Sequence, residues 1–289
     1  MANRRVLVTR RKAVRNIRKI TRTMQLIATA RFQAAYNRAT ASKPYTDKLA
    51  ELVADLSRAG ELRHPLLEAH NPGAPAALLV LTSMRGLCGG YNASVMRLAQ
   101  GRLEERKAAT QPTELRVFGK KGIAYFKFTR QAMAEQNLEI GEAPRYEKVE
   151  PVANALIERF LKGEISAVYV AYMRFYSAGR QRPEIAQLLP LVQPTQAGAA
   201  PRANVEYEFH PGAAELLDDL LPATVRVRLF QAFLDAAVSE QIARMSAMKA
   251  ATDASEEMIK TLTRQYNRAR QTAITMELLD IVGGANALA

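Results

Sequence analysis

The chain has 289 residues, of which 48% are hydrophobic, and its formal net charge is +13. This length suits one or two domains, and this hydrophobic content excludes a disordered chain. No apolar run reaches the roughly 18 residues that a membrane-spanning helix needs. The single cysteine, Cys88, excludes an internal disulfide, and the three histidines lack the spacing of metal ligands. We therefore expect neither a bound metal nor a cofactor.

The positive charge is concentrated near the amino terminus. Residues 1–60 hold 14 Lys and Arg against 3 Asp and Glu, whereas residues 61–221 and 222–289 each carry a net charge of +1. An Arg-rich start is typical of a mitochondrial transit peptide, but the apolar pattern continues past Tyr45 without a cleavage-type site. Three interpretations remain: a nucleic-acid-binding arm, a basic helix that meets an acidic protein partner, and a solvated basic face.

The first predicted element is a long helix over about residues 11–59, which would span roughly 70 Å. Residues 4–43 contain neither Gly nor Pro, and we expect Pro44 to perturb the helix only locally. Gly60 is the expected C-cap. The apolar stripe of this helix is read at Ile17, Ile20, Met24, Ile27, Ala34 and Ala41, and then at Tyr45, Leu49, Leu52 and Leu56.

The middle of the chain predicts a small α/β domain. Continuous apolar runs of strand type alternate with helical patterns, which favours a mainly parallel sheet. The predicted strands are 76–82, 115–119, 165–175 and 185–192. The predicted helices are 93–107, 122–128 and 152–161, and residues 194–204 are expected to form a loop.

A second long helix is predicted over residues 223–282, which contain neither Gly nor Pro, with Pro222 in its first turn. It would span roughly 90 Å, far beyond an ordinary globular helix. Its coiled-coil seam alternates spacings of three and four residues. The seam consists of Met245, Met248, Thr252, Ser255, Ile259, Leu262, Tyr266, Ala269, Ala273 and Met276.

Neither long helix can bury its stripe alone, and pairing the two solves both problems. The predicted fold is therefore of the mixed α+β class. An antiparallel coiled coil of the N- and C-terminal helices accompanies a central α/β domain with a mainly parallel sheet. The expected segments are 1–60 and 211–289 for the two helices and 61–210 for the α/β domain.

The motifs do not form a catalytic set. The glycine-rich segment Arg85–Gly90 follows a predicted strand, but Tyr91-Asn92 stands where a phosphate-binding loop needs Lys-Ser/Thr. We therefore read it as a tight turn that uses glycine at positive φ. Cys88 has no neighbouring histidine and is expected to be a small buried hydrophobe. The polar cluster Arg264–Gln271 suits either an outer coiled-coil face or a collar for a surrounding partner.

Three blocks of the sequence resemble the gamma subunit family of F-type ATP synthases. They are Ile17–Ala35 in the first helix, RGLCGGYN at Arg85–Asn92, and the C-terminal segments Ser239–Ser255 and Tyr266–Leu288. Two positions depart from the family pattern, Met84 before the glycine-rich block and Met276 near the C-terminus. The order of long helix, α/β domain and long helix agrees with the resemblance.

The resemblance implies a rotating central stalk that is not itself catalytic. Its coiled coil would enter a ring of alpha and beta subunits, and its α/β domain would meet the epsilon subunit and the membrane c ring. The implied location is the cytoplasmic side of a bacterial inner membrane, held peripherally. The implied ring contacts are Met24, Arg85, Arg244, Arg270, Gln271, Leu278, Leu279, Ile281 and Val282.

A basic coiled-coil protein that binds nucleic acid is the alternative function. It would use the basic segment 1–60, and its affinity for DNA would fall steeply with salt.

Overall fold

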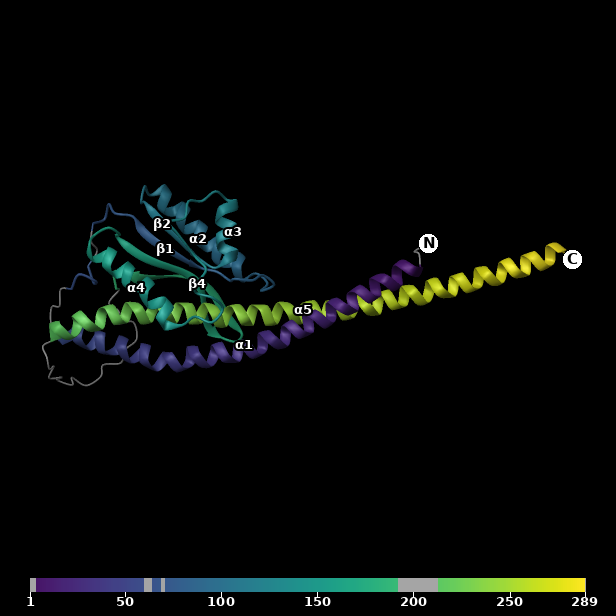
Figure 1. The fold of residues 1–289 in the computed structure, drawn as a ribbon, viewed down its shortest axis with the longest axis horizontal. Coiled ribbons are helices and arrows are strands. Elements are labelled where there is room, and N and C mark those ends of the chain that lie inside the picture. Colours follow the sequence, from purple (N-terminus) through teal and green to yellow (C-terminus); the bar gives the residue numbers. More distant parts are fainter. Residues whose placement is uncertain (1–3, 60–63, 69–70, 192–212, 289) are drawn as a thin grey trace. The chain divides into compact units, whose positions relative to one another are not determined.

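The computed structural model describes residues 4–59, 64–68, 71–191 and 213–288 (Figure 1). The chain divides into two compact units. One unit combines residues 1–30 with 244–289, and the other comprises residues 31–243. These two units are defined by contacts in space. The three segments expected from the sequence are successive ranges of the chain, so this division does not test them. The expected cap at Gly60 and the expected loop 194–204 lie outside the described residues.

The larger unit contains a five-stranded sheet in the order β3-β2-β1-β4-β5. The central strand β1 (Ala76–Leu81) pairs in parallel with β2 (Thr113–Phe118) and with β4 (Ala167–Ser177). The outer strand β3 (Glu135–Asn137) is also parallel, and β5 (Arg180–Leu189) returns antiparallel to β4. The expected, mainly parallel sheet is confirmed.

The two faces of the sheet carry separate cores, because successive side chains of a strand point to opposite sides. Leu78 and Val80 of β1 pack with α2 (Tyr91–Ala108) and α3 (Lys120–Phe128). Leu79 and Leu81 face the opposite way, toward α4 (Tyr146–Leu161) and the first turns of α5 (Ala213–Leu288). Figure 1 shows α2 and α3 on one side of the sheet and α4 on the other. A strand covered on both faces must be apolar throughout, which explains the run AALLVL.

The predicted elements of the domain are confirmed, with differences at their ends. The short strand β3 was not predicted, because three residues, Glu-Gln-Asn, carry no apolar pattern. The helix expected over 152–161 begins six residues earlier, at Tyr146. Strand β5 begins at Arg180 rather than at residue 185, because its first half is a polar part of a hairpin with β4.

The start of the C-terminal helix was predicted wrongly. Helix α5 begins at Ala213, so Pro222 lies in its interior and not in its first turn. A proline inside a helix leaves the carbonyl four residues earlier without its usual donor. Here that carbonyl belongs to Asp218, whose side chain is exposed, so water can reach this side of the helix. The helix therefore tolerates Pro222.

The buried face of α1 (Arg4–Ala59) also differs from the predicted stripe. Ile17, Ile20 and Ile27 are 50%, 59% and 48% exposed. The inward positions instead recur every seven residues, at Leu7, Val14, Thr21, Ala28, Ala35, Ser42 and Leu49, with a second set at Arg11, Arg18, Gln25, Phe32, Ala39, Thr46 and Val53. This alternation of four and three is a heptad pattern. It was missed because several inward residues are polar, while the more apolar isoleucines face outward.

Candidate partner-binding surfaces

In the smaller unit, α1 and α5 form an antiparallel pair. The hydroxyls of Thr21 and Thr252 lie 2.8 Å apart, and both side chains are buried. Toward the start of α1, the partners move later along α5: Arg18 pairs with Glu256 at 3.8 Å, and the Arg11 guanidinium lies 4.9 Å from the ring centre of Tyr266. The predicted antiparallel coiled coil is therefore confirmed, and Thr252 and Ser255 are its small polar centre.

The C-terminal seam is buried or half-buried from Met245 to Ala273. Met276 departs from that seam, because its side chain is 46% exposed. Beyond Ala273, every described side chain of α5 is exposed. The last turns of this helix are therefore not covered by another part of the described chain.

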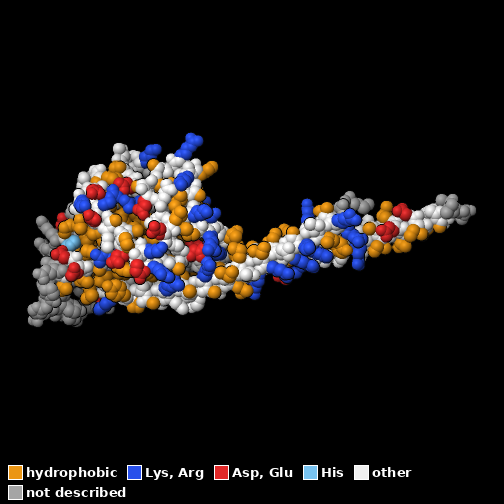
Figure 2. Space-filling view, in the orientation of Figure 1, with side chains coloured by type: hydrophobic (Ala, Val, Ile, Leu, Met, Phe, Trp, Pro, Cys, Tyr) orange, Lys and Arg blue, Asp and Glu red, His pale blue; other side chains and the backbone are white. Residues whose placement is uncertain are grey.

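Large apolar side chains stay exposed along this unit. Ile17, Ile20, Leu26 and Ile27 lie on α1, and Met258, Ile274 and Met276 on α5, each more than 45% exposed. Figure 2 shows apolar and basic side chains side by side on the coiled-coil part of the molecule. Isolated exposed hydrophobes are ordinary, but a run of them rimmed by charges marks a surface that meets another protein.

The structure places most of the predicted contact residues on this exposed surface. Arg270 and Gln271 are exposed, and Met24 is half-buried beside the heptad positions of α1. The apolar tip is open to solvent, with Leu278, Leu279, Ile281 and Val282 exposed by 57%, 60%, 68% and 55%. Arg244 differs from the others, because only 7% of it is exposed. Contact of these residues with a partner stays a prediction.

Arg85 belongs to the larger unit, in the turn between β1 and α2. The turn is held by Asn92, whose side-chain oxygen accepts from the Ser83 backbone at 2.9 Å and whose amide donates to the Ser83 hydroxyl at 2.7 Å. The same amide lies 3.1 Å from the sulfur of Cys88, which is buried as expected. Gly89 takes φ +56°, which glycine adopts without strain. The block RGLCGGYN thus builds a rigid turn that presents Arg85.

Arg85 and Arg31 of helix α1 contact the same carboxylate, that of Glu142. The Nε of Arg85 lies 3.0 Å from Oε1 of Glu142, and Arg31 of α1 donates to the other oxygen of the same carboxylate. The side chains of Arg85 and Arg31 are 70% and 44% exposed, whereas that of Glu142 is only 16% exposed. Sequence reasoning missed Glu142, because a lone glutamate in a loop carries no signal until the fold brings it to two arginines.

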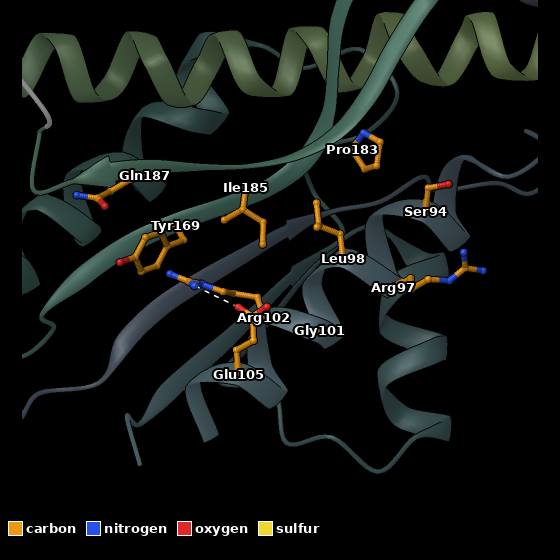
Figure 3. Close-up of a pocket in the computed structure, with 10 residues that line it drawn as sticks. All are labelled: Ser94, Arg97, Leu98, Gly101, Arg102, Glu105, Tyr169, Pro183, Ile185 and Gln187. Carbon is orange, nitrogen blue, oxygen red and sulfur yellow. Dashed lines mark hydrogen bonds and ion pairs between the residues drawn. The ribbon is translucent and has the colours of Figure 1, made fainter. Parts of the chain in front are cut away.

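A groove of about 770 Å³ opens between α2 and strands β4 and β5 (Figure 3). Leu98 and Ile185 form its apolar floor, and Arg102 lies over the ring of Tyr169 with 5.1 Å to the ring centre. Arg102 also pairs with Glu105 at 3.3 Å. The groove is wide open to solvent, so it resembles a surface hollow more than a small-molecule pocket.

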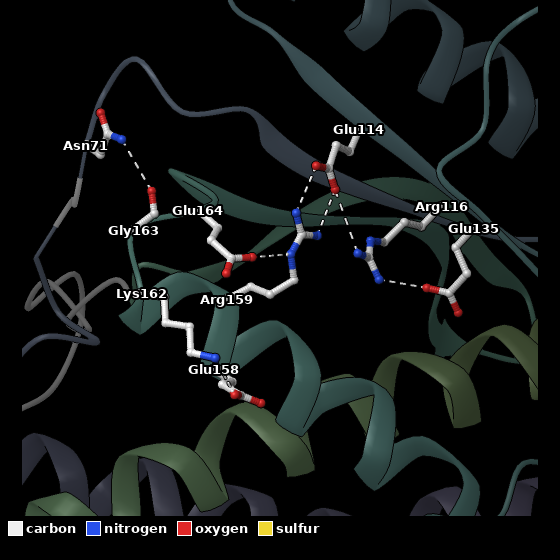
Figure 4. A network of polar contacts seen from close by, with 9 residues as sticks. All are labelled: Asn71, Glu114, Arg116, Glu135, Glu158, Arg159, Lys162, Gly163 and Glu164. Carbon is white, nitrogen blue, oxygen red and sulfur yellow. Dashed lines mark hydrogen bonds and ion pairs between the residues drawn. The ribbon is translucent and has the colours of Figure 1, made fainter.

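A network of ion pairs covers the opposite part of the domain (Figure 4). Arg159 of α4 donates to both oxygens of Glu114 on β2, at 2.8 and 2.9 Å, and to Glu164 at 3.0 Å. Arg116 joins β2 to β3 through Glu135 at 2.7 Å. The hydrogen bond from Arg159 holds the pKa of Glu114 below its usual range. These ion pairs tie α4, β2 and β3 together.

Among residues 4–59, 64–68, 71–191 and 213–288, no cluster of three or more His, Cys, Asp or Glu side chains could hold a metal ion. Over the same ranges, every helix falls short of the length or the apolar character that crossing a membrane requires.

The fold and its exposed surfaces define a class of protein: two terminal helices that form an antiparallel coiled coil, with a compact α/β domain inserted between them. A family model described as ATP synthase matches residues 3–288. The chain is 43% identical to the ATP synthase gamma chain of Rhodopirellula baltica over 100% of this chain and 99% of that one. It is 41% identical to the gamma chain of Dehalococcoides mccartyi over the full length of both. The chain belongs to the ATP synthase gamma chain family.

Solved structures agree on the fold. The rotor of the Euglena gracilis mitochondrial ATP synthase contains a chain that is 15% identical to this one, with a TM-score of 0.63. The match covers 94% of this chain and 98% of the other. A chain from the central stalk and c ring of the Tetrahymena thermophila mitochondrial enzyme is 17% identical, with a TM-score of 0.56 over 80% of this chain.

Proposed function

We propose that this chain is the central-stalk subunit of a rotary F-type ATP synthase. It turns inside a ring of alpha and beta subunits and transmits torque between that ring and a membrane c ring. The catalytic sites belong to the ring, and this chain supplies no catalytic residue. Family membership supports the proposal, since full-length relatives at 41–43% identity are ATP synthase gamma chains.

The observation that carries the proposal is the uncovered surface of the coiled coil. A helix pair that exposes isoleucines and methionines over many turns needs a further partner to shield them. A ring of subunits around the pair would provide that shield. The 14 Lys and Arg within residues 1–60 would then face acidic groups of the ring, which supplies charge complementarity.

Different parts of the coiled coil would meet the ring in different ways. The apolar tip at Leu278, Leu279, Ile281 and Val282 would turn in an apolar sleeve, where few directional bonds hold it at any one angle. Arg270 and Gln271 would form hydrogen bonds with a polar loop of the ring, because their side chains are exposed. Met24 would contact the ring from the side of the coiled coil. Arg244 would also contact the ring, farther from the apolar tip, although its side chain is buried in the free chain.

The α/β domain would take the other partners. We infer that it contacts the epsilon subunit and the c ring, which would hold the chain peripherally at the cytoplasmic side of a bacterial inner membrane. In this arrangement, residues 1–60 and 211–289 act as the shaft and residues 61–210 act as its base. The network around Arg159 and Glu114 would keep the base stiff under load.

Reconstitution with separately purified alpha and beta subunits tests the proposal. We expect one large complex by gel filtration, with ATPase activity that requires all three proteins. A chain that stays free while the activity is indifferent to it would contradict the proposal. Binding to DNA with a steep salt dependence in that case would point to nucleic acid instead.

A further inference from the structure

Among the described residues, four that are not glycine take a positive φ: Asn71, Leu87, Thr110 and Arg130. Three of them have an ordinary reason. Asparagine enters the left-handed region more readily than other non-glycine residues. Thr110 and Arg130 each lie just beyond the end of a helix, α2 or α3, where a left-handed residue commonly closes the last turn. Leu87, at φ +63°, has neither reason, because it lies in the turn between β1 and α2.

The turn forces this conformation on Leu87. On one side of it, the carbonyl of Arg85 accepts a hydrogen bond from the Ser83 hydroxyl at 2.5 Å. On the other side, the side chain of Cys88 is buried. Gly86 and Leu87 connect these two fixed points, and the left-handed conformation falls on the second of them. Glycine or asparagine is usual at such a turn position, because a larger side chain crowds the backbone there.

The side chain of Leu87 does not compensate for this strain within the domain. Leu87 is 61% exposed, and it belongs to neither of the two cores that the described residues form on the faces of the sheet. A leucine here disfavours folding twice, through its strained backbone and through apolar surface left in water. Folding alone therefore gives no reason for a leucine at this position.

A basic side chain lies beside the same turn. A Cβ atom on Gly86 would lie 3.4 Å from Cε of Lys121 and 3.6 Å from its Nζ, so this lysine lies against the residue next to Leu87. Lys121 and its neighbour Lys120 are both exposed at the start of α3. An exposed apolar side chain beside cations is complementary to an apolar pocket with acidic groups at its rim.

The turn also lies at the end of the domain where α1 leaves it. Glu142 contacts both Arg85 of the turn and Arg31 of α1. Arg31 is the first residue of the larger unit, and the preceding residues of α1 belong to the coiled coil. A ring of subunits around the coiled coil therefore has this turn within reach.

We propose that Leu87 is a partner-contact residue: its side chain inserts into an apolar, acid-rimmed pocket on a subunit of the surrounding alpha/beta ring, and the strained turn holds it out for that contact. This proposal rests on the proposed function. Because the turn already fixes the backbone in the free chain, little conformational freedom is lost when the contact forms.

The test measures two quantities for each full-length variant. One is the melting temperature of the free chain, and the other is the rate at which isotope-labelled chain leaves an immobilised alpha/beta ring in excess unlabelled chain. Leu87→Asn removes the apolar side chain and suits the left-handed conformation, whereas Leu87→Met keeps an apolar side chain of similar volume. Thr110→Asn is the matched control, because Thr110 is exposed, takes φ +57° and loses no charge.

We expect Leu87→Asn to leave the ring about tenfold faster, because one buried leucine side chain is lost from the contact. Its free chain should melt at the same temperature or up to about 3 °C higher, since the strain is relieved. Leu87→Met should leave within about threefold of the unmodified rate. Thr110→Asn should be at least as stable as the unmodified chain and leave at the unmodified rate. A residue needed only for folding would not speed release while the free chain stayed equally stable.

An unmodified release rate for Leu87→Asn would overturn the proposal while the rotor function stands, because that complex has assembled. A lower melting temperature for Leu87→Asn would also overturn it, since the leucine would then stabilise the domain itself. Equally fast release of Leu87→Met or Thr110→Asn would do the same, because an apolar contact at this turn would not be the cause. If the unmodified chain does not assemble with alpha and beta, the proposed function fails and this proposal fails with it.

Discussion

Thr21 and Thr252 place a hydrogen bond inside the coiled coil. Their hydroxyls lie 2.8 Å apart, and each also lies near a carbonyl of its own helix, at Arg18 and Met248. A polar pair in an apolar seam gains energy only when the two groups are opposite each other, so it fixes the register of the helices. Thr252 belongs to the seam predicted from the sequence, but its partner Thr21 could not be predicted.

Replacing one hydroxyl tests this bond. We expect Thr252→Val to lower the free energy of unfolding by about 1 kcal/mol, because the buried Thr21 hydroxyl loses a partner. The double variant Thr21→Val/Thr252→Val should cost less than twice that amount, since the hydrogen bond between the two hydroxyls can be lost only once. Urea denaturation of the free chain measures both. Thr272→Val is the control, because Thr272 is exposed on the same helix; equal costs for Thr252 and Thr272 would contradict the assignment.

Asp235 is a buried carboxyl on α5. Its side chain accepts a hydrogen bond from Gln231 at 2.8 Å, Gln231 in turn accepts from Ser42 of α1 at 2.7 Å, and Arg174 and Lys43 contribute favourable charge. Burial outweighs these effects and raises the pKa of Asp235 from 3.8 to about 6. The folded chain therefore binds this proton more tightly than the unfolded chain.

The sign of the pH dependence follows from that shift. Between pH 3.8 and about 6 the folded chain holds more protons at Asp235, so this group's contribution to stability falls as pH rises and is constant above that range. We expect Asp235→Asn, which keeps the acceptor for Gln231, to stabilise the chain at pH 8 by up to about 3 kcal/mol. The gain should vanish near pH 4. Urea denaturation at both pH values, with the exposed Asp253→Asn as control, measures it; an equal gain at both would contradict the assignment.

At the scale of elements, the side chains that α1 buries are not the ones that the spacing of its apolar residues predicts. Its isoleucines point outward, and a heptad of mixed Leu, Ala, Ser and Thr points inward. We expect Ile17→Ala and Ile20→Ala to change the free energy of unfolding of the free chain by less than about 0.5 kcal/mol each. Assembly with alpha and beta should nevertheless weaken.

Ala28→Asp is the opposite case, because Ala28 is 1% exposed. We expect it to destabilise the free chain by more than about 2 kcal/mol, since an unpaired charge would enter the seam. Thermal melting ranks the three variants. A large drop in melting temperature for the isoleucine variants, with none for Ala28→Asp, would instead support the buried stripe first predicted from the sequence.

Most strands and helices of the domain were predictable from apolar runs and helical patterns, and β1, for example, is apolar on both faces. Strand β3 was not, since Glu135–Asn137 gain strand structure from pairing with β2 and from the Arg116–Glu135 ion pair. The start of α5 could not be predicted either, because a proline such as Pro222 is typical of the first turn of a helix. These failures share a cause: tertiary contacts decided against the local pattern.

At the scale of the whole molecule, the candidate site is a set of surfaces spread along the chain. The exposed tip and the polar residues Arg270 and Gln271 could be named from the resemblance, because they sit in distinctive blocks of sequence. Glu142 could not, because the two arginines that contact it lie more than 50 residues away in sequence. Long-range polar partners of this kind appear only once the chain is folded.

Met24 offers a prediction for the working complex. Met24→Lys should leave the fold intact, since the side chain is only half-buried beside the seam. A new positive charge at the contact between the coiled coil and the ring should weaken the coupling of ATP hydrolysis to ion pumping. Proton pumping per ATP in reconstituted vesicles measures the coupling, with Met24→Leu as the control. Unchanged pumping per ATP in Met24→Lys would contradict this role.

Rotation of the chain within a fixed alpha/beta ring is the most direct test of its proposed function. Cys88 is buried, so a cysteine introduced at the exposed Gly179 of the β4–β5 hairpin can carry a bead selectively. With the ring immobilised and ATP supplied, we predict continuous rotation of the bead in one direction, with pauses at low ATP. A complex that assembles and hydrolyses ATP while the bead only fluctuates about one angle would contradict the rotor function.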